Sequence, residues 1–300
     1  MQCQLDWKRQ TDITSGLHLV TAPLQGRQVV DSKLAEEFAP AAKTLLVAFE
    51  TLGLLREALC HTLLPLSAQI HGSRQLSELA LAKLKGRSQV TSTEVAKLAG
   101  AMIVLDQAVD TTWPDLEEQL QLRSGPLVQQ WQARGPGLLR QISQLTDESL
   151  MVPRADVVLV YPSLGGAGEA HLSFNSVHIE AALTNPVAPL PEPVRLVWLI
   201  SQLNNDLPMF SESIAAARLR KVAALAMIPP TLAAAELVDW SVYNQETVGL
   251  ALQHWMTIDV EIEAVSAQVR QWWEMYQAQR PPWAVALGAL DQMIGTCDSY

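Results

Sequence analysis

The sequence predicts a mainly α-helical protein, a bundle-like body around one central β-hairpin. Apolar residues recur at spacings of three, four and seven along most of the chain, as in the stripe from Leu34 to Leu59, and this period is typical of amphipathic helices. One stretch near the middle differs, because Val157–Tyr161 is short and rich in β-branched residues. We therefore expect helices on both sides of a hairpin at about residues 156–183.

The first 31 residues are ambiguous, and residues 17–20 and 28–30 are candidates for short strands around Gly26. A long helical pattern begins at Ser32. Pro40 lies inside this pattern, so we expect a kink or a restart of the helix there.

After Pro65 a second helix is expected to run to Lys85, with Gly86 as its C-cap. The next helix is expected to begin with a capping box in which Thr91 and Glu94 bind each other's backbone N–H groups. Further helical segments follow, with expected breaks at 125–126 and 135–137.

The expected hairpin pairs residues 157–161 with residues 171–183 through a glycine-rich connection, Leu164–Gly168. A stiff, proline-rich link follows at 186–193. We expect an N-terminal helical lobe at 1–150 and a lobe of hairpin plus helices at 151–300, packed as one body. The expected C-terminal helices are 194–206, 211–227, 230–240, 244–257, 260–278 and 283–294.

Composition excludes several classes of protein. The chain has 300 residues, 49% of them apolar and 17% charged, which argues against intrinsic disorder. The net charge of −10 argues against a nucleic-acid partner. The three cysteines are too far apart to form a zinc knuckle or a disulfide framework. No secretory signal or membrane-spanning apolar run is present, so we expect a soluble cytoplasmic protein without a membrane partner.

The common catalytic motifs are missing. The sequence contains no phosphate-binding P-loop, no HExxH, no nucleophile elbow and no kinase signature. The glycines at 165–168 lead into a strand, whereas a dinucleotide-binding turn must open a helix. No cofactor is therefore predicted from motifs, and zinc enters only through the alternative that follows.

The strongest local candidate for chemistry is the pair His178 and Glu180. Alternate residues of a strand share a face, so these two side chains are expected on one side and His171 on the other. A zinc site needs more than two protein ligands, and Glu212 or Glu236 is the candidate third. The alternative is a solvent-facing strand with an incidental ion pair.

Two groups of residues are candidates for binding. Arg195 or Arg218, with the neighbouring Arg220 and Lys221, is a candidate contact for an anion; the alternative is a solvated helix face. Five of the nine tryptophans lie beyond residue 239. Trp272 and Trp273 are adjacent on a helix and are not expected to face one core together. These C-terminal helices are therefore a candidate docking surface for a protein partner; the alternative is core packing.

The order of elements resembles the core of zincin metallopeptidases, in which a β-hairpin precedes an apolar helix that carries HExxH. In this chain Ser201, Gln202 and Asn205 occupy that frame. Hydroxyl and amide groups do not replace two imidazoles as zinc ligands, and Gln202 cannot accept a proton as a glutamate base does. The resemblance, over about residues 150–240, implies an eroded site without peptidase activity.

Three functions are compatible with these observations. The first is a non-catalytic binding or scaffold protein, in effect a pseudoenzyme on a zincin-like frame. The second is a metal-dependent hydrolase that uses His178 and Glu180. The third is a helical domain that binds a small anion between the hairpin and the helices.

Overall fold

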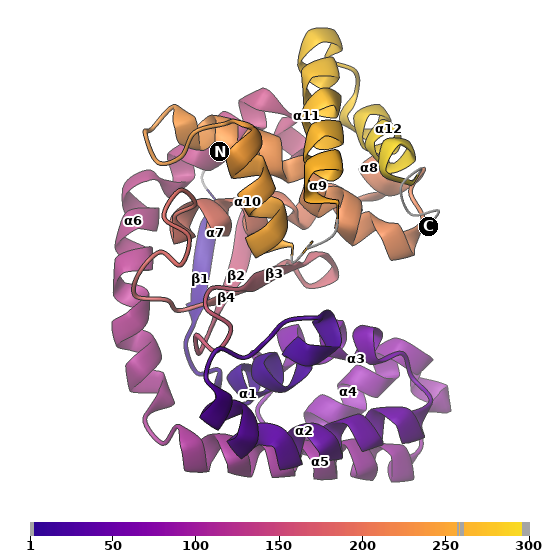
Figure 1. The fold of residues 1–300 in the computed structure, drawn as a ribbon. Helices are drawn as coiled ribbons and strands as arrows, with labels where there is room; N and C mark the ends of the chain where they lie inside the picture. The colour runs from indigo at the N-terminus through magenta and orange to yellow at the C-terminus, as the bar shows by residue number, and fades with distance from the viewer. Residues whose placement is uncertain (1–2, 257, 259–260, 296–300) are drawn as a thin grey trace.

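The computed structural model describes residues 3–256, 258 and 261–295. Two helical lobes lie on opposite faces of a small sheet, and one long helix runs along the side of both lobes (Figure 1). The structure is 69% helical, with 12 helices and four strands in the part of the chain that it describes. The predicted fold class, mainly α with a small central β unit, is confirmed.

The N-terminal lobe contains five helices under the sheet in Figure 1. The predicted end at Gly86 is confirmed, with a φ of 86° that favours glycine. The predicted capping box of Thr91 and Glu94 is also confirmed. The helices are α1 (Asp12–Thr21), α2 (Ser32–Leu52), α3 (Arg56–Ser67), α4 (Ser73–Lys85) and α5 (Ser92–Thr112).

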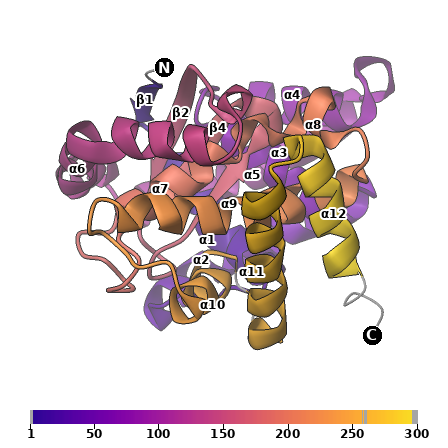
Figure 2. The same cartoon turned by 90° about the horizontal axis from the view of Figure 1, so that it is seen from above.

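The C-terminal lobe stands on the opposite face of the sheet (Figures 1 and 2). A short 3-10 turn (Leu203–Asp206) follows its first helix. The helices are α7 (Glu192–Ser201), α8 (Pro208–Ser211), α9 (Ala216–Glu236), α10 (Gln245–Trp255), α11 (Ile262–Gln279) and α12 (Trp283–Gly295).

Prolines interrupt fewer helices than expected. Helix α2 continues through Pro40. Helix α6 (Leu116–Leu145) continues through both predicted breaks, and α9 through Pro229 and Pro230. A proline inside a helix costs about 3 kcal/mol, and the buried faces of these helices offset that cost. In α9 every residue from 222 to 232 is buried.

The central β unit differs from the predicted hairpin. Strands β1 (Gln4–Lys8), β2 (Arg154–Val160) and β4 (Ser176–Glu180) are parallel neighbours, and β3 (Gly168–His171) pairs antiparallel with β4 at the edge. The hairpin is therefore β3–β4, and residues 161–167 link two strands that do not pair. The expected N-terminal strands are wrong, since residues 17–20 belong to α1 and residues 28–30 form no strand.

Each face of the sheet packs against one lobe. Val157, Leu159, Val177 and Ile179 belong to the hydrophobic core that the C-terminal helices share. The alternate residues of β2 and β4 face α1 and the end of α3. Polar side chains on that second face therefore become buried between the sheet and the N-terminal lobe.

The tryptophan-rich helices form a core. Trp272 and Trp273 are both buried, so the expectation that they cannot face one core is wrong. Trp273 joins Trp272, Tyr276 and Trp283 in one aromatic cluster, because α9, α10 and α12 surround α11 on several sides. Docking of a protein partner on these helices stays a prediction.

Among the described helices, no single one is long and apolar enough to cross a membrane. Helices α2 and α3 reach that length and apolar character only together, and the chain bends by 114° at their junction.

Candidate metal centre

The hairpin β3–β4 places four ionisable side chains on one face of the sheet. Residues 172–174 form a 3-10 turn and Asn175 adopts a left-handed conformation with a φ of 49°, which asparagine tolerates better than most residues. The chain therefore reverses between His171 and His178, and the Nε2 atom of His171 lies 2.8 Å from Nδ1 of His178. The expectation that His171 faces away from His178 is wrong, because it treated residues 171–183 as one continuous strand.

A candidate metal centre lies between this hairpin and α3. His61 of α3 and Glu169 and His171 of β3 each offer one ligand atom, and the three atoms lie within 4.8 Å of one another. Nδ1 of His61 is 2.7 Å from Oε1 of Glu169. That nitrogen has no hydrogen-bond partner with adequate geometry among the described residues. Two histidines and one carboxylate are a ligand set that zinc takes in catalytic sites.

Both histidines have a second partner that orients the ring. Nε2 of His61 lies 3.4 Å from Oε1 of Glu57, one helical turn away. The ring of His171 contacts Nδ1 of His178 through Nε2, at 2.8 Å. Such outer partners fix the tautomer of a metal-binding histidine and raise its basicity.

The protonation states of these groups suit a cation. Burial lowers the pKa of His171 to about 4, although the charge of Glu169 opposes that change. Burial would raise the pKa of Glu169, but His61, His171 and His178 together outweigh it and lower the pKa below its usual value. At pH 7, His171 is therefore neutral and Glu169 is ionised, as metal coordination requires.

The candidate centre lies in the wall of a cavity of about 500 Å³ between the two lobes. His61 and Glu169 line one side, and Trp198, Arg220 and Trp255 are among the residues of the other lobe that line the rest. In Figure 1 strand β3 correspondingly lies between α3 and the helices α9 and α10. A metal ion at this wall would keep a coordination position open to the cavity.

Glu180 lies on the predicted face but does not contact the candidate centre. Its carboxylate accepts hydrogen bonds from the backbone N–H groups of Ser163, Leu164 and Gly166 at 2.8, 2.6 and 2.6 Å, and Oε1 lies 3.0 Å from Nε2 of His18. Burial would raise its pKa, but these hydrogen bonds and His18 lower it instead. Glu180 therefore holds the glycine-rich loop against the sheet.

The other predicted metal ligands lie apart from one another. His178 contacts the ring of His18 and also His171, so it is a neighbour of the candidate centre. Glu212 is exposed after α8, and Glu236 is exposed at the end of α9, where it accepts a hydrogen bond from the backbone of Tyr243.

The residues in the HExxH-like frame bind their own helix. Ser201 and Gln202 both donate side-chain hydrogen bonds to the carbonyl of Trp198. Asn205 donates to the carbonyls of Ser201 and Gln202 and accepts from Trp283. Gln202 also lines the cavity of the candidate centre. The zincin resemblance stays a prediction.

The predicted anion contacts divide into two groups. Arg195 is 1% exposed and lies against Glu192 at 3.4 Å, out of reach of solvent. Arg218 pairs with Asp291 of α12 at 2.7 Å. Arg220 and Lys221 line the same cavity as His61 and Glu169, so the structure brings two of the four to the candidate centre.

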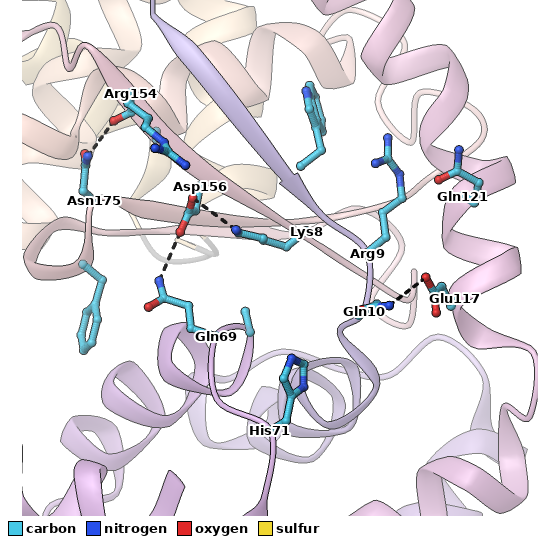
Figure 3. A pocket seen from close by; sticks show the side chains of 14 residues that line it. Lys8, Arg9, Gln10, Gln69, His71, Glu117, Gln121, Arg154, Asp156 and Asn175 are labelled. Atoms are coloured by element: carbon cyan, nitrogen blue, oxygen red, sulfur yellow. Dashed lines mark hydrogen bonds and ion pairs between the residues drawn. The ribbon is translucent and has the colours of Figure 1, made fainter. Parts of the chain in front are cut away.

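A second hollow of about 740 Å³ opens on the β1 side of the sheet (Figure 3). Its charged side chains largely engage each other: Lys8 lies 3.9 Å from Asp156, which also accepts a hydrogen bond from Gln69, and Gln10 donates to Glu117. No group of three metal-ligating side chains lies here among the described residues. It is therefore a weaker candidate for a functional site.

Comparison with known protein families, curated proteins and solved structures finds no match.

The sequence pattern did not single out His61 and Glu169 as candidate ligands, and it placed His171 on the wrong face of the sheet. His61 is far from the hairpin in sequence, and only the packing of α3 brings it there. A local signal for the hairpin did exist, because Asn175 is followed by Ser176 and both residue types favour turns. A turn at Asn175 would have placed Glu169, His171 and His178 on one face.

Proposed function

We propose that this chain is a metal-dependent hydrolase, with zinc held by His61, Glu169 and His171. The observation that carries the proposal is that three ligand atoms from two separate elements lie within 4.8 Å at the wall of a cavity. A catalytic zinc ion takes three protein ligands and water, and it lowers the pKa of that water towards neutrality. Such a hydroxide would supply the nucleophile for hydrolysis of a substrate held in the cavity.

The surrounding residues support this reaction. Glu57 and His178 orient the two histidine ligands through the contacts given above. Arg220 lies 4.0 Å from Glu169 and lines the cavity, so its guanidinium is placed to stabilise negative charge that develops beside the metal. Trp198 and Trp255 add an apolar wall to the cavity, against which the apolar part of a substrate can pack.

The first test measures zinc. The full chain is loaded with zinc, dialysed and analysed by elemental mass spectrometry. We expect about one zinc per wild-type chain, none in His61→Ala or His171→Ala, and an unchanged content in His71→Ala, an exposed histidine on the surface of the N-terminal lobe. His178→Ala is expected to keep the site and to weaken zinc affinity by about 10- to 100-fold, as outer partners do.

Hydrolysis is measured in the same preparation with 4-nitrophenyl acetate, an activated ester that metal-bound hydroxide attacks readily. We expect activity in the zinc-loaded wild type and its loss in His61→Ala. A protein that retains no zinc, or whose zinc content is insensitive to both ligand substitutions, would overturn the proposal and leave a non-catalytic binding protein as the remaining interpretation.

A further inference from the structure

The cavity beside the candidate metal centre contains a guanidinium without a counter-ion. Arg27 follows the short 3-10 turn after α1, lines the cavity and is half-buried. Its one hydrogen bond among the described residues runs from Nη2 to the carbonyl of Trp255, at 3.4 Å. No carboxylate within the described part of the chain lies at ion-pair distance from it. A partly buried cation of this kind is costly unless an anion joins it.

A second guanidinium lines the same cavity. Arg220 reaches across from α9 to Glu57 of α3 at 3.2 Å and to Glu169 of β3 at 4.0 Å. Arginine binds phosphate and carboxylate groups with paired N–H donors. The largely exposed Glu57 contacts only Nη2 of Arg220 at this distance. A guanidinium carries five N–H donors, so Arg220 has further donors for an anion in the cavity.

The charge of the site favours a doubly charged group. In the wall of the cavity the two guanidinium groups of Arg27 and Arg220 balance the two carboxylates of Glu57 and Glu169. A divalent metal ion at the proposed centre would bring the local charge to about +2. A phosphate monoester carries about two negative charges at pH 7, whereas a carboxylate carries one and a simple carboxylic ester carries none.

The remaining wall is aromatic. The rings of Trp198 and Trp255 lie with their centroids 5.0 Å apart, and both residues line the cavity. Trp255 is buried, and its indole Nε1–H has no hydrogen-bond acceptor in the described structure. This wall suits the apolar part of a substrate.

We propose that the cavity takes a phosphate monoester of an apolar alcohol, with the phosphate between the metal centre, Arg27 and Arg220 and the alcohol against Trp198 and Trp255. In the reaction the oxygen of a water molecule, which the metal ion would activate, would bond to phosphorus, and the bond from phosphorus to the alcohol oxygen would break. The alcohol oxygen receives one proton of the water, and the products are the alcohol and inorganic phosphate. This inference rests on the proposed function for its hydrolytic step.

The test compares two probes that share a leaving group. 4-Nitrophenyl phosphate carries the charged group and 4-nitrophenyl acetate does not, and both release the same absorbing phenol. For the zinc-loaded wild type we expect a higher kcat/KM with the phosphate. Arg27→Gln should lower kcat/KM for the phosphate by about 10- to 100-fold, as the loss of one charged hydrogen bond predicts, and should lower that for the acetate much less, because the acetate offers no charged group to Arg27. Arg140→Gln, on the exposed face of α6, is the matched control.

A second readout does not require turnover. Inorganic phosphate should raise the melting temperature of the wild type and of Arg140→Gln, and it should shift that of Arg27→Gln much less. This measurement also applies if Arg27→Gln folds less well, because each protein is compared with itself.

The outcomes separate the two proposals. Zinc-dependent cleavage of the acetate, with no cleavage of the phosphate and no phosphate-induced stabilisation, would overturn the phosphate inference and leave the hydrolase intact. Equal phosphate binding by Arg27→Gln and wild type would also overturn it. Absence of zinc would overturn the proposed function, and phosphate stabilisation that requires Arg27 would then support the anion site alone.

Discussion

Replacement of Glu180 by glutamine tests how the glycine-rich loop is held. The carboxylate accepts three backbone hydrogen bonds, from residues 163, 164 and 166, and contacts His18. A glutamine amide has one acceptor oxygen, and its NH₂ group would face at least one backbone N–H. Two donors then meet without an acceptor in a site that is 0% exposed.

The expected loss follows from these contacts. A buried donor left without a partner costs about 1–3 kcal/mol. The hydrogen bonds that remain lose the negative charge that strengthens them, which weakens each by about 1 kcal/mol. Glutamine no longer requires a buried charge, and this gain offsets part of the loss. We therefore expect Glu180→Gln to lower the free energy of unfolding by about 2–4 kcal/mol.

The assay is urea denaturation followed by tryptophan fluorescence, together with hydrogen exchange of the backbone amides at 163, 164 and 166. Glu212→Gln, at an exposed carboxylate, is the control. A change below about 0.5 kcal/mol, or unchanged exchange of all three amides, would refute the reasoning. The zinc content should stay that of the wild type, because Glu180 does not reach the candidate centre.

The same contacts determine a dependence on pH. The folded protein lowers the pKa of Glu180 below its unfolded value, so the stabilising contribution is complete above the unfolded pKa and is lost as the pH falls through the folded pKa. In Glu180→Gln this contribution is absent, and stability should change less between pH 5 and more acidic conditions. An identical acid dependence in both proteins would contradict the assignment.

Three further predictions concern other parts of the fold. Thr91→Ala removes the capping box of α5 and should cost about 1 kcal/mol of unfolding free energy by urea denaturation; a value near zero would mean that the cap is dispensable. Burial raises the pKa of the Cys60 thiol to about 12 and that of Cys3 to about 11. Both thiols should therefore resist alkylation by iodoacetamide at pH 8 in the native protein and react in urea, as measured by peptide mass spectrometry. Rapid alkylation of the native protein would contradict this prediction. Gly168→Ala places a methyl group 2.7 Å from the carbonyl oxygen of His178 and 2.8 Å from Leu199, so it should destabilise the protein by about 1–3 kcal/mol, whereas Gly100→Ala, which has open space around it, should not.

Several features could be predicted from the sequence because they depend on neighbours in the chain. The capping box of Thr91 and Glu94 and the helix end at Gly86 are local, and both are confirmed. The predicted breaks at Pro126 and Pro136 are wrong, because the local cost of a proline competes with the burial of a whole helix face.

In the candidate site, too, the sequence indicated some of the residues, whereas the contacts between them depend on the fold. The sequence singled out the segment around His178 and Glu180, and Arg220 and Lys221 as basic residues of interest. It indicated two separate sites, one at His178 and Glu180 and one at the basic residues, and it connected neither with His61. In the structure, Arg220 and Lys221 line one cavity with His61 and Glu169. No spacing in the sequence relates these residues.

The sequence by itself determined the mainly helical class, the helix caps and the local character of the central strands. These follow from hydrophobic period and backbone preference, which act over a few residues. Only the tertiary structure decided that α3 and α9 approach the edge of the sheet beside β3. That approach depends on the packing of two separate cores against opposite faces of one small sheet, and it brings the distant His61 to Glu169 and His171 in one candidate metal centre.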